Sequence, residues 1–243
     1  EKWQLFQRKP STGKKVAVIG SGPAGLAAAA QLNYAGHLIT VFERDDVIGG
    51  LLRYGIPYFK LEKWVVDRRL NLLEEEVIIF KCNANVGVKI SSNDLLREYH
   101  AIILAGGSTI PRDLSIPGRD LKGIHFAMDF LKQQNKRVSH KEVKDENIFA
   151  TEKNVVVIGG GDTGSDCVGT SNRQKAVSVT QFELMPKPPG SRTPFMPWPS
   201  YPMILKTTSS HEEGANRHWA VATKEFIGDE NGNLKALKIV DLE

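Results

Sequence analysis

A glycine-rich pattern occurs twice in this 243-residue chain, and the duplication constrains the fold more than any other feature of the sequence. The first copy spans residues 14–32 and the second spans residues 153–171. In each copy, a run of β-branched and apolar residues ends in Ile and is followed by Gly-x-Gly-x-x-Gly and a helix-like stretch. This order is typical of the strand, tight turn and helix of a Rossmann-like unit. The sequence therefore predicts an α/β fold with two Rossmann-like nucleotide-binding domains.

The three glycines of each copy meet different needs. Gly20 allows a sharp turn from strand to helix, Gly22 leaves room for a pyrophosphate, and Gly25 allows the helix to pack closely on the strand. The free amides at the start of the helix then face the phosphates, and the helix dipole adds positive potential there. The second copy repeats this set as Gly159, Gly161 and Gly164.

An acidic residue follows a second apolar stretch behind each turn. Residues 38–42 lead into Glu43, and residues 177–182 lead into Glu183. Both acids stand about 20 residues beyond the first glycine, where a carboxylate accepts hydrogen bonds from the adenosine ribose. One glycine motif alone also fits an ordinary strand-turn-helix connection. Two copies with both acids in place indicate that the protein holds two dinucleotides at once.

Composition and charge exclude several other classes of protein. The length suits two domains of about 100–150 residues, and no apolar run approaches the ~20 residues that cross a bilayer. The net charge is +4, but the basic residues are scattered and lack interleaved aromatic residues. We therefore expect neither a membrane nor a nucleic-acid partner. The use of only two cysteines fits a reducing, cytoplasmic compartment.

The cysteine and histidine content limits the metal and redox chemistry of the chain. Cys82 and Cys167 form no Cys-x-x-Cys motif, which a dithiol reductase of the thioredoxin-reductase kind normally carries. An iron–sulfur cluster would need about four thiolates, so this chain cannot hold one by itself. His211-Glu212-Glu213 lacks the i, i+4 histidine spacing of a helical zinc site. We expect no metal site, and we interpret this stretch as the start of a surface helix.

Further elements are predicted in the first half of the chain. Residues 48–63 predict an irregular segment that wraps a ligand, and residues 63–76 predict a helix. Residues 101–104 predict a buried strand, followed by Ala105-Gly106-Gly107 at the end where open α/β sheets bind ligands. Residues 111–118 predict a crossover between domains.

The second half carries a connector, a proline-rich segment and a hairpin. Residues 132–152 predict the connector because they are mostly polar and charged. Seven of the 12 prolines lie between residues 186 and 202, which excludes regular structure from this proline-rich segment. We interpret it as a lid or edge over the second nucleotide. Residues 221–243 predict a β-hairpin around the turn at 229–233, and Cys167 is predicted to be a buried helix residue.

The longer strings of the sequence carry a family resemblance. The chain resembles the small (β) subunit of glutamate synthase, including the version fused within larger glutamate synthases. The similarity covers nearly the whole chain, and the glycine motifs alone are shared by many flavoprotein reductases. The more specific strings are AGGSTIPRDLSIPGRDLKGIHFAMDFL, GGLLRYGIP, and the stretch from FELMPKPP through PWPSYP to SSHEEG, beside VAVIGSGPAGLAAA and VVVIGGGDTGSDC.

The resemblance implies an FAD domain built from two separated segments, with an NAD(P)H domain inserted between them. Residues 1–117 would hold the first FAD segment, and residues 118–243 would form most of the NAD(P)H domain. By the family pattern, FAD would be bound by Gly20, Gly22, Pro23, Ala24, Gly25, Glu43, Arg44, Gly50, Leu51, Arg53, Ile56, Val86, Ala105, Gly106 and Gly107. NADPH or NADH would be bound by Gly159, Gly161, Asp162, Thr163, Gly164 and Glu183.

The chain departs from the family pattern in several ways. An acid usually follows the Gly-Ile-Pro motif where this chain has Tyr58, and glycine is common where Lys175 stands. Family members also have an N-terminal cysteine-rich iron–sulfur domain and a C-terminal segment that completes the FAD domain. Neither is matched here, so we expect the chain to be a fragment.

The resemblance implies the role of an electron-input module. In the family, hydride passes from NAD(P)H to the flavin, and electrons then pass singly through iron–sulfur clusters to the subunit that makes glutamate. The expected partners are the glutamate synthase large subunit and iron–sulfur clusters outside this chain. Hydride transfer needs stacking and short distance more than acid–base help, so we assign no catalytic residue.

Three alternatives remain open. The chain could serve another enzyme with the same input module, such as a pyrimidine dehydrogenase or a transhydrogenase, although the stretch from FELMPKPP to SSHEEG favours glutamate synthase. A flavin monooxygenase also carries two glycine motifs, but its Phe-x-Gly-x-x-x-His linker is missing between them here. The third alternative is a non-catalytic binding or assembly domain.

The choice between NADH and NADPH depends on the end of the second apolar stretch. Glu183 can accept hydrogen bonds from a ribose 2′-hydroxyl and repel a 2′-phosphate, which favours NADH. Lys187 and Arg192 follow on the proline-rich segment and could instead reach a phosphate. We expect NADH to be accepted at least as well as NADPH, and a preference for NADPH is the alternative.

Overall fold

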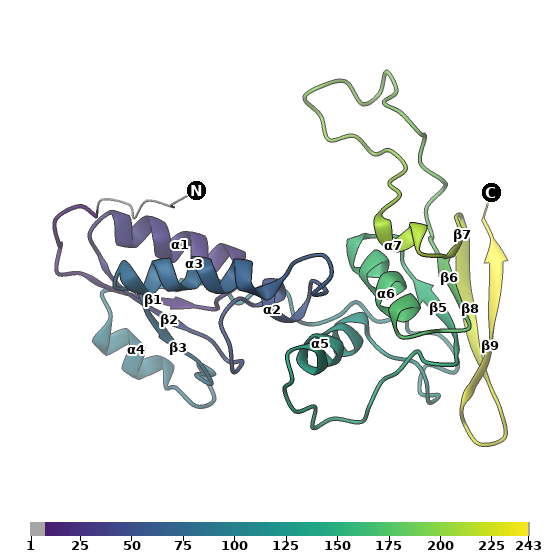
Figure 1. The fold of residues 1–243 in the computed structure, drawn as a ribbon, viewed down its shortest axis with the longest axis horizontal. Coiled ribbons are helices and arrows are strands. Elements are labelled where there is room, and N and C mark those ends of the chain that lie inside the picture. Colours follow the sequence, from purple (N-terminus) through teal and green to yellow (C-terminus); the bar gives the residue numbers. More distant parts are fainter. Residues whose placement is uncertain (1–7, 243) are drawn as a thin grey trace. The chain divides into compact units, whose positions relative to one another are not determined.

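The computed structural model describes residues 8–242 and divides the chain into two compact units (Figure 1). The first unit ends at Pro111 and the second begins at Arg112. This division falls inside the crossover expected at residues 111–118. The assignment of residues 1–117 to an FAD domain and of residues 118–243 to an NAD(P)H domain stays a prediction.

The first unit is built on a four-stranded sheet with the order β3-β2-β1-β4, in which all paired strands run parallel. Helices α1 and α3 cover one face of this sheet, and α4 lies on the other (Figure 1). The glycine turn joins β1 to α1, as the sequence predicts. The elements are β1 (Lys15–Ile19), α1 (Pro23–Tyr34), β2 (Leu38–Phe42), α2 (Leu51–Tyr54), α3 (Lys63–Glu75), β3 (Ile79–Lys81), α4 (Ser92–Glu98) and β4 (Ala101–Leu104).

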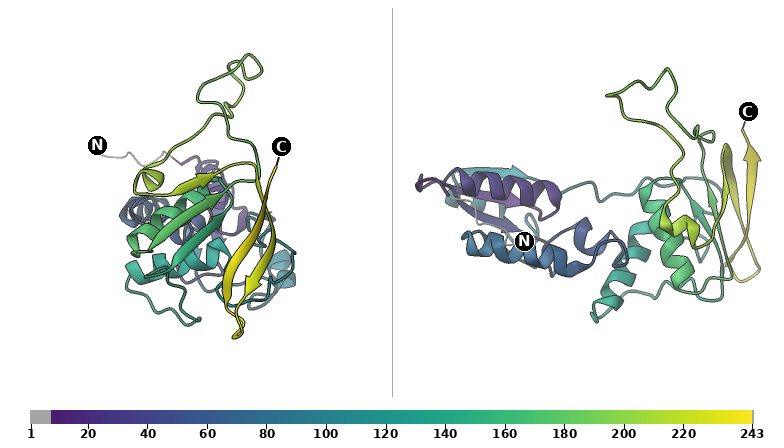
Figure 2. Two further views of the ribbon diagram at one scale, coloured as in Figure 1. Left: turned by 90° about the vertical axis from the view of Figure 1, so that its right-hand side faces the viewer. Right: turned by 45° about the horizontal axis from the view of Figure 1, so that its top comes forward.

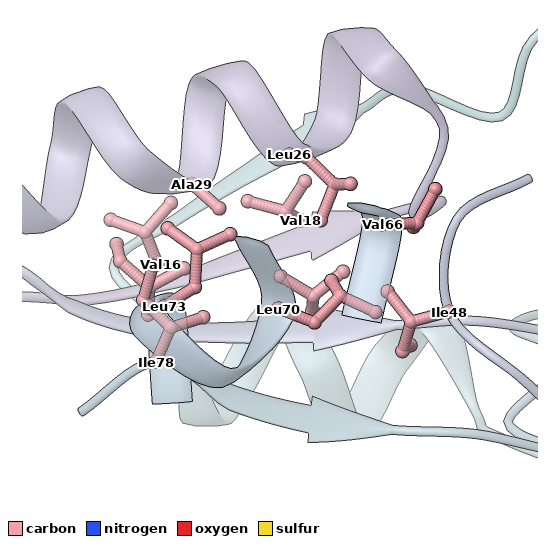
Figure 3. Packing of buried hydrophobic residues seen from close by; sticks show 11 residues of the cluster. Val16, Val18, Leu26, Ala29, Ile48, Val66, Leu70, Leu73 and Ile78 are labelled. Atoms are coloured by element: carbon pink, nitrogen blue, oxygen red, sulfur yellow. The ribbon is translucent and has the colours of Figure 1, made fainter. Parts of the chain in front are cut away.

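The core of the first unit lies between the strands β1 and β2 and the helices α1 and α3 (Figure 3). Val18 of β1 and Ala29 of α1 have no exposed surface, and Leu73 of α3 is 1% exposed. Full burial of a Val or Leu side chain contributes about 1.5–3 kcal/mol to the free energy of folding, and the smaller Ala contributes less. This packing fixes the direction of β1 and α1, and therefore the position of the turn between them.

Two expectations for the first unit need correction. The irregular segment at residues 48–63 contains the short helix α2. The strand β4 is not buried, since Leu104 is 82% exposed. The reason is its position, because β4 is the last strand in the sheet order and pairs with β1 alone.

The second unit repeats the strand, turn and helix on a three-stranded parallel sheet with the order β5-β6-β7. An antiparallel hairpin follows, in agreement with the sequence (Figure 2). The elements are α5 (Ala127–Val138), β5 (Asn154–Ile158), α6 (Asp162–Arg173), β6 (Ser178–Phe182), α7 (Ser209–Glu212), β7 (Asn216–His218), β8 (Val221–Gly228) and β9 (Leu234–Asp241).

The region before β5 differs from the expected connector. Residues 132–138 belong to α5, which buries Phe130 and Leu131 against Cys167 of α6. Cys167 is the buried helix residue that the sequence predicts. Its burial raises the pKa of the thiol to about 12. The proline-rich segment contains no helix or strand, as expected, and extends away from the rest of its unit (Figure 2).

Candidate nucleotide-binding sites

The first glycine turn packs closely against neighbouring backbone on one side and borders open space on the other. Gly20 has a φ of +105°, and its N–H donates to Phe42 O over 2.8 Å. A Cβ added to Gly20 would lie 2.3 Å from Ala105 O, and one added to Gly25 would lie 2.0 Å from Gly20 O. A Cβ added to Gly22 would meet nothing within 4 Å. Packing therefore requires glycine at two positions, whereas Gly22 borders open space at the start of α1.

The second turn has the same construction. The Gly159 N–H donates to Phe182 O over 2.8 Å, and a Cβ on Gly164 would lie 2.3 Å from Gly159 O. A Cβ on Gly161 would again meet nothing within 4 Å. One difference concerns Gly159, which has no described neighbour in the place that Ala105 takes beside the first turn. Both turns thus leave room before a helix N-terminus, where a pyrophosphate would fit.

The two acids are held by matching hydrogen bonds. Glu43 is 5% exposed, and its Oε1 accepts the Asp45 N–H over 2.8 Å while its Oε2 accepts the Ser21 N–H over 3.1 Å. Glu183 Oε1 accepts the Met185 N–H over 3.1 Å, and its Oε2 accepts the Gly160 N–H over 2.7 Å. Each carboxylate is therefore fixed between its own strand end and the glycine turn. A carboxylate oxygen accepts more than one hydrogen bond, so capacity remains for ribose hydroxyls.

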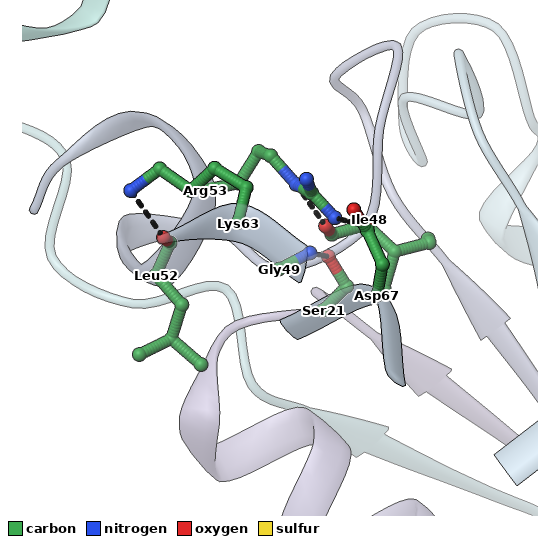
Figure 4. A network of polar contacts seen from close by, with 7 residues as sticks. All are labelled: Ser21, Ile48, Gly49, Leu52, Arg53, Lys63 and Asp67. Carbon is green, nitrogen blue, oxygen red and sulfur yellow. Dashed lines mark hydrogen bonds and ion pairs between the residues drawn. The ribbon is translucent and has the colours of Figure 1, made fainter. Parts of the chain in front are cut away.

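Ser21 is a structural residue of the first site that the sequence reasoning missed. Its hydroxyl donates to Glu43 Oε2. The same hydroxyl accepts the Gly49 N–H over 2.9 Å (Figure 4). A Cβ on Gly50 would lie 2.9 Å from the Cα of Gly22, so this loop leans directly on the glycine turn. The second unit cannot copy this arrangement, since a Cβ on Gly160 would lie 2.2 Å from Glu183 Oε2.

Arg53, an expected FAD contact, binds other parts of the chain in this structure. Its guanidinium pairs with Asp67 of α3, and its Nε donates to Ile48 O over 3.2 Å (Figure 4). The Lys63 ammonium donates to Ile56 O over 2.6 Å and also bonds the Leu52 carbonyl. These bonds fix α2 against α3. Arg53 therefore positions the segment beside the turn.

The remaining expected FAD contacts differ in exposure and in their distance from the glycine turn. Those close to the turn come from the start of α1 and the end of β4, since the Ala105 N–H donates to Ile19 O over 2.8 Å. Val86 lies farther along the chain, bridged to Ile90 and packed beside the buried Phe42 cluster. The exposed members of the expected set are Pro23, Ala24, Arg44, Leu51, Gly106 and Gly107.

The second turn presents an open surface. Gly161, Asp162 and Thr163 are exposed at the start of α6, and Glu183 is half-buried beside them. Within residues 8–242, no group of three or more His, Cys, Asp or Glu side chains is arranged to hold a metal ion. The same residues include no helix of the length and apolarity that a membrane span requires.

Comparison with known proteins places the chain in a family. Residues 14–238 match the pyridine nucleotide-disulphide oxidoreductase family. The chain is 52% identical over 231 residues to the glutamate synthase [NADPH] small chain of Mycobacterium tuberculosis, covering 93% of this chain and 47% of the relative. It is 50% identical over 254 residues to the glutamate synthase [NADH] of Schizosaccharomyces pombe, covering 100% of this chain and 12% of the relative. The chain thus spans about half the length of the curated small chains that it matches.

The solved structures agree on the fold. FprA from Mycobacterium tuberculosis, as its His57Gln mutant, superimposes with a TM-score of 0.70 at 18% identity, over 93% of this chain and 63% of that chain. This likeness confirms the predicted α/β fold class. The family match confirms an oxidoreductase module that uses FAD and NAD(P)H. The assignment of individual residues to either nucleotide stays a prediction. The chain belongs to the pyridine nucleotide-disulphide oxidoreductase family and is, within it, a module like the small subunit of glutamate synthase.

Proposed function

We propose that this chain is the electron-input module of a glutamate synthase, in which hydride passes from NAD(P)H to FAD. The observation that carries this proposal is the repeated construction of a glycine turn with a fixed carboxylate behind it. Each such site would bind one dinucleotide, and hydride transfer requires two bound dinucleotides. FAD, when bound, supplies a two-electron acceptor that can release electrons singly. The residues of the chain bind and orient the nucleotides, and no side chain is assigned to proton transfer.

The proposal gives each turn its own nucleotide. FAD binds the first, where the Gly22 position leaves space for the pyrophosphate and Glu43 receives the ribose. NAD(P)H binds the second, where Gly161 and Glu183 have the same roles. The other residues named from the family pattern complete these two sites, and the domains follow as residues 1–117 and 118–243. The glutamate synthase large subunit, iron–sulfur clusters outside this chain and a cytoplasmic location belong to the same proposal.

The surroundings of Glu183 support acceptance of NADH at least as well as NADPH. The carboxylate is fixed between two backbone amides and carries the charge that repels a 2′-phosphate. Arg192 donates to the carbonyls of Met196 and Ser200 inside the proline-rich segment. Lys187 lies over the Trp219 ring, 4.9 Å from its centroid. Both cations thus have partners within the chain, and neither bonds the Glu183 carboxylate.

The function is tested with the purified chain loaded with FAD and mixed anaerobically with NADH or NADPH. Loss of the oxidised flavin absorbance is expected with at least one of them. Binding of both nucleotides with no flavin reduction would support the alternative of a non-catalytic binding domain. Failure to bind either nicotinamide nucleotide would contradict the assignment of the second turn.

A further inference from the structure

A buried polar network lies directly behind the second glycine turn. His211 of α7 is 9% exposed, and its Nε2 lies 3.0 Å from Gln181 Oε1 on β6. The Gln181 amide nitrogen donates to Gly159 O over 2.8 Å. The expected surface helix at residues 211–213 needs correction: a helix is present and Glu212 and Glu213 are exposed, but it begins at Ser209, and Ser210 and His211 are buried. The network joins α7 to the carbonyl of the first glycine of the motif.

The hydrogen bonds fix which ring nitrogen of His211 carries the proton. The Thr208 N–H donates to Nδ1 over 3.1 Å, so Nδ1 is the acceptor. The proton then lies on Nε2, which donates to Gln181 Oε1 and leaves the Gln181 amide nitrogen to donate to Gly159. The hydroxyl of Thr208 also lies 2.6 Å from the Ser165 hydroxyl on α6. His211, Gln181, Thr208 and Ser165 thus each have a hydrogen-bond partner in this row.

Gln181 is the unusual member of the network. It is 2% exposed, and it stands one residue before the end of β6, where the matching strand β2 has Val41. A buried amide is costly unless both its oxygen and its nitrogen are bonded, so an apolar residue would serve better if packing were the only need. The first turn is supported instead by Ala105 and by Ser21. At the second turn a Cβ on Gly159 would meet nothing within 4 Å, so no described residue takes the place of Ala105. Gln181 and His211 support this turn through the Gly159 carbonyl instead.

We propose that His211 is a positioning residue for the nicotinamide nucleotide. Through Gln181 it holds the Gly159 carbonyl, and with it the amides that face the phosphates. Through Thr208 it joins the end of the loop that follows the proline-rich segment to the same turn. This inference rests on the proposed binding of NAD(P)H at the second turn.

The test compares variants that remove one end of the network at a time. His211→Gln keeps a nitrogen donor near the Nε2 position and loses the Nδ1 acceptor. His211→Asn keeps an acceptor for the Thr208 N–H and is too short to reach Gln181. Ser210→Ala is the matched control, since Ser210 is fully buried on the same helix and its hydroxyl has no hydrogen-bond partner among the described residues.

Affinities for NADH and for NADPH are measured separately by calorimetry on the whole chain. We expect His211→Asn to weaken binding of the preferred nucleotide roughly tenfold, which corresponds to about 1.4 kcal/mol. The affinity of His211→Gln should stay within about threefold of the wild-type affinity, and the affinity of Ser210→Ala should equal that of wild type. Amide hydrogen exchange should accelerate at residues 160–164 in His211→Asn and stay unchanged at residues 21–25. Gln181→Leu, which keeps the volume, should reproduce the loss.

The outcomes separate this inference from the proposed function. If wild type binds neither nucleotide, the assignment of the second turn fails and the inference fails with it. If wild type binds and His211→Asn and Gln181→Leu bind within twofold, the function stands and the positioning role is wrong. Equal loss of exchange protection in α5 would mean that His211 merely stabilises its unit, which would also overturn the role.

Discussion

Replacing Gly22 with valine should abolish flavin binding without unfolding the protein. Gly22 has a φ of −67° and a ψ of −179°, a conformation open to valine, and an added Cβ meets nothing within 4 Å. The free energy of unfolding should therefore change by no more than about 0.5 kcal/mol, as for ordinary surface substitutions. The side chain would instead fill the space in front of α1 that the pyrophosphate needs.

The loss of affinity follows from the hydrogen bonds that the phosphates would no longer make. Each bond from a helix-start amide to a charged phosphate contributes about 1.5–3 kcal/mol. The loss of two of them is about 3–6 kcal/mol, so the flavin affinity should fall at least about 100-fold. Binding of the nicotinamide nucleotide should remain nearly intact. Gly161→Val, at a φ of −77° in the second turn, should do the reverse.

Gly25→Ala is the contrasting variant. Its single added carbon would lie 2.0 Å from Gly20 O, so the helix must move away from the strand. We expect a clear fall in melting temperature for this smaller substitution, and almost none for Gly22→Val. The assays are thermal unfolding of the chain, and titration with FAD and with NADH and NADPH, repeated in the intact enzyme. If both valine variants lost the same nucleotide, or if Gly22→Val unfolded the first unit, the reasoning from the open space would be refuted.

Four further outcomes are expected. Glu183→Gln should shift the ratio of kcat/KM for NADH and NADPH toward NADPH; a strong wild-type preference for NADPH with an unchanged ratio would show that Glu183 does not contact the ribose. The purified chain should hold FAD weakly or incompletely, and stoichiometric, tightly held flavin in its absorbance spectrum would contradict this. Cys82, which is exposed, should react with a thiol reagent at neutral pH, while Cys167, with its pKa raised to about 12, should react only after unfolding. Leu73→Ala should lower the free energy of unfolding by about 2–5 kcal/mol in a denaturant titration, because Leu73 is 1% exposed.

The two strand-turn-helix units could be predicted from sequence because their signals are local. An apolar run, three glycines and a second apolar run fix both the elements and their order, and the structure has them at residues 15–42 and 154–182. The helix α5 was missed because its apolar side is narrow, with Phe130 and Leu131 set among polar and charged residues. Its helical state depends on packing against α6, which the sequence does not reveal.

In the candidate site too, local features could be predicted from the sequence, whereas contacts between distant residues could not. The exposure of Leu104 depends on which strand ends the sheet, and neighbouring residues carry no information about that. His211 meets Gln181 across 30 positions of the chain, so its burial could not be predicted from the HEE string. One local signal was present, namely an amide side chain near the end of a stretch at residues 177–182 that otherwise contains Val, Ser, Thr and Phe.

The serine at position 21 and the glycine at position 160 lead us to expect different residence times for the two coenzymes proposed at these turns. Ser21 ties the loop at residues 49–50 to the first turn, so in the intact enzyme we expect a coenzyme bound there to dissociate slowly. At the second turn Gly160 has no hydroxyl that could hold a loop in this way, and Gly161, Asp162 and Thr163 are exposed, although the His211 network supports that turn from behind. A carrier that is regenerated in place gains from slow exchange. A nucleotide that delivers hydride must dissociate in every cycle, so its dissociation rate limits turnover. The more open second turn suits such a nucleotide.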